Sequence, residues 1–170
     1  MAVANTKSNI VTNLDATPQV RNSLALMGGV LREQVATVEV AAADCDNSVY
    51  RLFRVHSSWR LSELTYFSDT LTSATSASFG FYQTAENGGA LVNINPLADA
   101  VNIATASLVG VQMLWEAGSD NGVEDIETRV WQMLALTADS ARFYDLCMTI
   151  NSVGAAAGTL SARLRYIANT

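Results

Sequence analysis

Short stretches of alternating apolar and polar residues constrain this chain more than any other feature of its sequence. The two clearest are RFYDLCMTI (142–150) and TLSARLRYI (159–167), and the small-residue loop NSVGAAAG joins them. An alternation of period two places every second side chain on the same face of a strand. Both stretches are therefore predicted to be strands that bury one face.

The same pattern recurs along the chain from residue 35. A bulge, or partial cover on both faces, is expected in SVYRLFRV (48–55), because its alternation shifts phase at Phe53. Seven or eight short strands at fairly regular spacing, with one long helix, predict a mainly β chain folded as an antiparallel, jelly-roll-like β-sandwich. The other strand-like stretches are VATVEVAA (35–42), WRLSELTYFSDT (59–70), FGFYQ (79–83), ALVNI (90–94) and SLVGVQMLWEA (107–117).

Two segments interrupt the strands with helical signals. VEDIETRVWQML (123–134) is predicted to be one amphipathic helix that packs across a sheet or closes one end of it, because its apolar residues recur at helical spacing. Acidic residues crowd its N-terminal end, and Asp125 and Arg129 are spaced as a helical ion pair. Asn95-Pro96 resembles a helix start, so one or two helical turns are expected after it.

Residues 1–33 differ from the sandwich predicted over 34–170. They contain isolated apolar residues without a sustained period, and Pro18 and Gly28-Gly29 break the segment further. Disordered tails contain fewer Leu, Ile and Val than this, which favours an extended arm that becomes ordered against a partner. The residues expected to contact that partner are Ile10, Val11, Leu14, Val20, Leu24 and Met27.

The stretch FGFYQTAENGGALV (79–92) could hold a ligand in a glycine loop or reverse a strand. It contains none of the spaced glycine motifs that cradle phosphate groups. Phe79 and Phe81 alternate as in a core strand, and Asn87-Gly88 is a preferred pair where turn residues need positive φ. A strand-reversing turn is therefore predicted.

Charge and composition limit the classes of function. Charged residues make up 15% of the 170, below the usual value of about 25%, and the net charge is −6. A weakly charged surface is either simply polar or covered by partners. The acidic balance, with scattered arginines, argues against binding to nucleic acid. The single lysine, Lys7, lies in the arm and is a poor candidate for amine catalysis.

The cysteines and the distribution of apolar residues indicate the cellular compartment in which the protein is made. Cys45 and Cys147 are far apart and form no framework, so both are expected to be free, buried thiols. No secretory signal and no run long enough to span a bilayer is evident. A soluble protein made in a reducing cytoplasm is expected.

The sequence contains only weak signals for a catalytic or metal site. The only histidine, His56, precedes Ser57-Ser58 in a tight connection, and no nucleophile-elbow motif accompanies it. Asp44, Asp46 and Asn47 could offer oxygens to calcium but match a turn better. One histidine and two distant cysteines cannot make a zinc site. No enzymatic activity, cofactor or metal is predicted.

Two further possibilities stay open at this stage. Paired carboxylates on a jelly roll could hydrolyse glycosidic bonds, but the pattern gives no reason to group Glu63, Asp69 and Asp145. Aromatic side chains could form a sugar-binding face, although their positions favour core packing. These are the tyrosines and Trp59, Trp115 and Trp131.

Three stretches of the sequence resemble those of a known family. They are ATVEVAAADCDNSVYRLFRV, FGFYQTAENGGALVN, and the C-terminal part from RVWQMLALTAD through RFYDLCMTINSVGAAAGTLSARLRYI. Together they are similar to the small capsid proteins of tailed bacteriophages that decorate or cement the head. The likeness extends from SNIVTNLDAT to the last predicted strand, and it rests on the order in which these stretches follow one another.

The resemblance implies a jelly-roll-like sandwich that forms dimers or trimers. It also implies binding to the outer surface of a shell of major capsid protein, where such a protein fastens neighbouring capsomers. No catalytic or cofactor residue comes with it, and no contact with nucleic acid or membrane. The alternative is a virion-surface module that binds a carbohydrate or receptor.

Overall fold

A computed structural model describes residues 6–71, 75–116, 118–152 and 157–168, and the strands among them form a two-layered β-sandwich. Every strand pairing within its two four-stranded sheets is antiparallel. The first sheet has the order β1 (Leu31–Val40), β8 (Gly158–Ile167), β3 (Arg60–Ser68) and β6 (Ser107–Gln112). The second has the order β2 (Val49–His56), β7 (Phe143–Ser152), β4 (Ser76–Gln83) and β5 (Leu91–Asn102).

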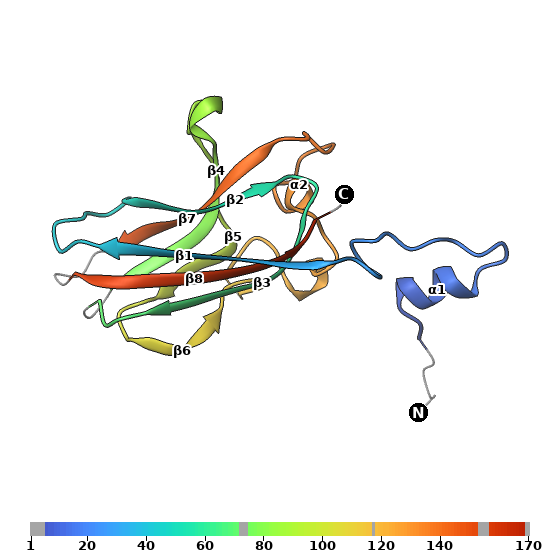
Figure 1. Cartoon of the computed structure of the whole chain (residues 1–170), viewed down its shortest axis with the longest axis horizontal. Coiled ribbons are helices and arrows are strands. Elements are labelled where there is room, and N and C mark those ends of the chain that lie inside the picture. Colours follow the sequence, from blue (N-terminus) through green and yellow to red (C-terminus); the bar gives the residue numbers. More distant parts are fainter. Residues whose placement is uncertain (1–5, 72–74, 117, 153–156, 169–170) are drawn as a thin grey trace.

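The path of the chain confirms the jelly-roll-like prediction. Strands that follow one another along the chain lie in opposite sheets, except for the β4–β5 hairpin. The sheets therefore face each other as two layers (Figure 1). The loop predicted between 150 and 159 lies partly outside the described residues, as does the connection before β4.

Alternation along the strands builds the core between the sheets. On β8, Leu160, Ala162 and Leu164 are buried, while Ser161 and Arg163 are partly exposed on the other face. Burying the apolar side chains of both inner faces is the main stabilising contribution to such a fold. The fully buried large side chains include Leu61, Leu64, Phe79, Phe81, Leu97, Leu146, Met148 and Ile150.

The irregularity predicted in β2 and the turn predicted after β4 are both present. The β2–β7 register shifts between Arg51 and Phe53, where the phase of the sequence pattern changes. The chain also reverses after β4, as expected, through the short 3-10 helix η1 (Ala85–Asn87). The positive φ angles of this turn belong to Gly88 (93°) and Gly89 (66°), so the glycine pair, not Asn87, supplies the left-handed backbone.

The helical turns expected after Asn95-Pro96 are absent, and that prediction is wrong. The segment belongs to β5, which runs through Pro96 to Asn102. Because β5 is the edge strand of its sheet, a missing N–H at the proline removes no bond that the sheet needs.

The prediction of one long amphipathic helix over 123–134 is also wrong. The segment contains the 3-10 helix η2 (Val123–Asp125) and the short helix α2 (Val130–Met133), separated by turns. The N–H groups of Val130 and Trp131 donate to the carbonyls of Trp59 and Ser57, so tertiary contacts replace helical hydrogen bonds. Val123 and Ile126 are exposed, and only the α2 end is buried.

The longest helix among the described residues lies in the arm, where none was predicted. It is α1 (Asn9–Asp15), and Figure 1 shows it away from the sandwich, beyond the start of β1. No helix in the described part of the chain is long and apolar enough to cross a membrane.

The cysteines are both free, but the expectation that both are buried is wrong for one of them. Cys147 lies within β7 and is buried, whereas Cys45 lies in the β1–β2 turn and is exposed. Burial raises the pKa of the Cys147 thiol to about 12.

Candidate interaction site

The arm helix is held by local hydrogen bonds and not by packing. Ser8 caps its N-terminus, with its Oγ accepting from the Val11 N–H at 3.4 Å. Lys7 and Asp15 form an exposed ion pair of 2.7 Å across the helix. None of the seven helical residues is buried. An isolated helix of this length is marginal in water.

The structure leaves most of the predicted arm contacts open to solvent. Ile10 is half-buried, and the other five side chains are exposed. Their exposed fractions are 42% for Val11, 38% for Leu14, 49% for Val20, 63% for Leu24 and 48% for Met27. These six residues, which we call the arm contacts, give the arm an apolar surface.

The root of the arm, residues 23–29, is fixed to the sandwich. Ala25 is buried, and its carbonyl accepts from Arg60 Nε at 2.7 Å. Arg129 donates to Ser23 Oγ at 3.1 Å. A Cβ on Gly29 would lie 2.4 Å from Ile167 Cγ2, so only glycine allows the chain to pass this close to β8. Partial burial lowers the pKa of the Arg60 guanidinium.

A second apolar surface lies at the β6 edge of the first sheet. Leu108 is 80% exposed and Val109 is 92% exposed, and β6 pairs with β3 on one side only. The sequence predicted a strand here but could not show that it was an edge. Exposed edges are usually protected by charged residues, yet residues 102–115 contain none. This edge is therefore suited to being covered by another protein.

The outer face of the first sheet neutralises its own charges. Arg165 bridges Glu33 and Glu63, at 2.8 and 2.9 Å, and Arg163 donates to the same Glu63 at 2.9 Å. Hydrogen bonds from Thr65, and then from Arg163, lower the pKa of Glu63. The face therefore offers little net charge to a charged ligand.

The residues considered for catalysis are not arranged for it. His56 Nδ1 lies 2.8 Å from Ser58 Oγ, while Asp139 accepts from Ser57. The acid thus bonds to a serine instead of orienting the histidine, unlike a hydrolytic triad. The Ser57 hydrogen bond lowers the pKa of Asp139. No group of three or more metal-ligating side chains occurs among the residues described.

The three carboxylates considered for glycoside hydrolysis make separate interactions. Glu63 belongs to the first sheet and Asp145 to the second, where Asp145 pairs with Arg51 at 2.7 Å and Arg54 at 2.9 Å. Asp69 accepts from the backbone N–H of Thr159. Glu63 and Asp145 therefore lie on different sheets, each with arginine partners of its own.

The possible calcium and sugar sites have structural roles. Asp44 accepts from the Ala41 N–H and from the Tyr50 hydroxyl, and the Tyr50 hydrogen bond lowers its pKa. This matches the turn interpretation. Trp59 stacks on Tyr166 with centroids 4.2 Å apart, and Trp59 and Trp115 pack against the core.

Comparison with known proteins gives a likeness of structure only. No protein-family model and no curated protein matches the sequence. A chain from the capsid of Ralstonia phage GP4 matches the structure with a TM-score of 0.61 at 14% identity, over 84% of this chain and 86% of that one.

Two weaker likenesses carry no argument. One is to the cyanophage Pam1 capsid asymmetric unit, with a TM-score of 0.45 and 15% identity over 84% of this chain and 88% of that one. The other is to the acid-stable capsid of Helicobacter pylori bacteriophage KHP30. Its TM-score is 0.37, with 13% identity over 83% of this chain and 95% of that one. The GP4 likeness shows that the sandwich fold occurs in a phage capsid.

Proposed function

We propose that this chain is a structural protein of a bacteriophage head. It binds the outside of the shell and cements neighbouring copies of the major capsid protein. The likeness to a GP4 capsid chain supports a virion role, because it extends over 84% of this chain. The chain acts as a binding protein and not as an enzyme.

The exposed apolar arm is the observation that carries the cementing role. The hydrogen bonds of α1 and of residues 16–22 in the described chain join residues of the arm itself. Figure 1 shows the arm extending beyond the sandwich, so it could reach a second subunit while the sandwich sits on the first. Opening a seam between capsomers would then require breaking the arm interface too.

Many weak contacts of this kind suffice on a shell. Each copy that is held at two points gains from the high effective concentration of the second contact. An arm that orders on binding loses conformational entropy, and burial of its apolar side chains offsets that loss.

Deletion of residues 1–22 tests the proposal. This cut keeps Ala25 and Ser23, which hold the arm root to the sandwich. We expect the free energy of unfolding in urea to change by no more than about 0.5 kcal/mol. We also expect binding to heads that lack the protein, measured by co-sedimentation, to be weakened, because the cut removes Ile10, Val11, Leu14 and Val20. Full binding by the truncated protein would contradict the assignment of the arm.

A matched pair of substitutions separates apolar contacts from other effects of the arm. Val11→Ser with Leu14→Ser removes two exposed apolar side chains, while Thr12→Ser with Asp15→Ser changes polar positions of the same helix. Only the first pair should weaken co-sedimentation.

Specific binding to a glycan array, lost on substitution of a tryptophan, would instead favour the receptor-binding alternative.

A further inference from the structure

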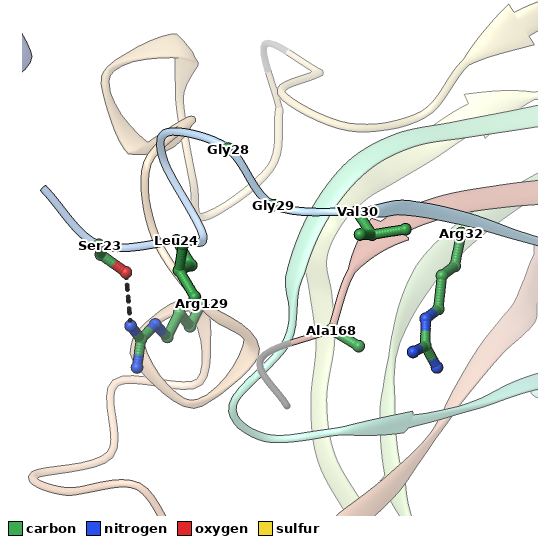
Figure 2. Close-up of a pocket in the computed structure, with 8 residues that line it drawn as sticks. All are labelled: Ser23, Leu24, Gly28, Gly29, Val30, Arg32, Arg129 and Ala168. Atoms are coloured by element: carbon green, nitrogen blue, oxygen red, sulfur yellow. Dashed lines mark hydrogen bonds between the residues drawn. The ribbon is translucent and has the colours of Figure 1, made fainter.

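A pocket of about 320 Å³ lies where the arm root meets the sandwich. Its lining comes from three separate parts of the chain: the arm with the start of β1, the turn before α2, and the residue that follows β8. Figure 2 shows these residues together, with Ala168 between the two arginine side chains in this view. The lining residues are Ser23, Leu24, Gly28, Gly29, Val30, Arg32, Arg129 and Ala168.

The charge of this pocket is opposite to that of the whole chain. Among the residues that the structure describes, Arg32 and Arg129 are the only charged ones that line it, whereas the chain carries a net charge of −6. Within the described residues, the Arg32 side chain forms no ion pair or hydrogen bond. A second pocket shares Ser23 and Arg129 but includes Glu124 and Glu127. The acidic side chains therefore line the second pocket, and the charged side chains described in the first pocket are both positive.

The polar groups of the pocket are partly held in place. The hydrogen bond from Arg129 to Ser23 Oγ restrains one guanidinium (Figure 2). Arg32 lies on β1, so its backbone is fixed by pairing with β8. Gly28, with φ of 85°, shapes the backbone wall, and Leu24 and Val30 add apolar lining. A guanidinium binds a carboxylate through two parallel hydrogen bonds, and fixing it beforehand reduces the entropy lost on binding.

We infer that this pocket binds the carboxylate of an Asp or Glu side chain in an extended segment of the shell protein, next to an apolar residue. The inference rests on the proposed function for the identity of the partner. Its chemistry rests on two arginines, an apolar wall and a volume suited to one or two side chains. An acidic segment bound in this pocket would contact both the arm root and the sandwich. It would therefore fix the direction in which the arm extends from the sandwich.

The chemistry can be tested without capsids. The probe is N-acetyl-Leu-Asp amide, and its neutral isostere N-acetyl-Leu-Asn amide is the control, titrated into the full-length ¹⁵N-labelled protein. We expect saturable NMR shifts at Gly28, Gly29 and the Nε–H groups of Arg32 and Arg129 with the aspartate probe alone. Equal shifts with both probes would overturn the inference, as would equal shifts at Arg142, an exposed arginine outside the pocket.

Charge reversal tests the role on the shell. Arg32→Glu and Arg129→Glu should each weaken co-sedimentation with heads by about tenfold to a hundredfold. Arg142→Glu makes the same charge change elsewhere and should have little effect. Urea unfolding of all three variants shows whether each is folded, and Arg32→Gln provides a milder second variant.

The outcomes separate this inference from the proposed function. If the wild-type protein does not bind heads, the proposed function fails. If the wild-type protein binds and both pocket variants bind like Arg142→Glu, the inference fails while the proposed function stands. Weakened self-association of the pocket variants, with unchanged binding to heads, would overturn the shell partner in favour of a second copy of this chain.

Discussion

At the scale of single residues, Gly80 on β4 is a tightly constrained position. Its neighbours Phe79 and Phe81 face the core, while its own outer side meets the backbone of β5. A Cβ here would lie 2.3 Å from the carbonyl oxygens of both Asn93 and Ile94. The sequence stretch that looked like a ligand loop thus includes a glycine that permits two strands to approach closely.

Gly80→Ala should lower the free energy of unfolding in urea by at least about 2 kcal/mol, because backbone atoms must move to admit the methyl group. Gly88→Ala is the control, since the nearest atom to its Cβ is 4.0 Å away and only the positive φ opposes the change. That control should cost about 1 kcal/mol. Equal effects of the two substitutions would contradict the close approach.

The two thiols should differ in reactivity. At pH 8, Ellman's reagent should modify Cys45 rapidly and Cys147 only after unfolding, because burial raises the pKa of Cys147 to about 12 and disfavours the reactive thiolate. One equivalent of thiol is expected in buffer and two in denaturant. A Cys45→Ser variant that still reacts in buffer would show that β7 opens readily.

At the scale of elements, the sandwich has one exposed strand edge without charged residues, β6. Its side chains Leu108 and Val109 are almost fully exposed, whereas the outer face of the same sheet carries paired charges on β1, β8 and β3. A shell surface or a second copy could cover this edge by apolar contact, by strand pairing, or by both.

Leu108→Lys with Val109→Lys should change the free energy of unfolding by no more than about 0.5 kcal/mol, since neither side chain packs in the core. If the edge is an interface, the double variant should bind heads less well. Thr137→Lys with Ala138→Lys adds the same charge at exposed positions elsewhere and serves as the control. Undiminished binding of the β6 variant would leave this edge outside the interface.

At the scale of the whole molecule, the sandwich and the apolar arm differ in how their apolar side chains are buried. The sandwich has a complete core of its own, while most of the arm contacts remain exposed. This division suits a protein that attaches as a folded body and then ties its neighbours together.

Heads that carry the protein should contain it in a fixed ratio to the major shell protein. They should also release DNA at a temperature several degrees higher than heads that lack it, because many weak contacts act together. A fluorescent DNA dye measures this on heating, and adding back the truncated chain 23–170 is the control. Equal release temperatures with and without the full-length protein would contradict a cementing role.

The sequence by itself determined the fold class and most strand positions. A period of two is a local property, so it marks strands such as 142–150 and 159–167 whatever lies beside them. It also predicted the turn after β4 and, in β2, either a bulge or partial cover on both faces, of which the structure shows the register shift. The apolar residues of the arm were likewise visible, although the helix α1 among them was not.

Only the tertiary structure decided features that depend on distant parts of the chain. The 123–134 segment broke into short pieces because its backbone bonds to Trp59 and Ser57, and Pro96 stayed in a strand because that strand is an edge. The β6 edge and the pocket of Arg32 and Arg129 also arise from which segments meet in space. Local patterns carry no information about such neighbours, which is why the predicted site was limited to the arm.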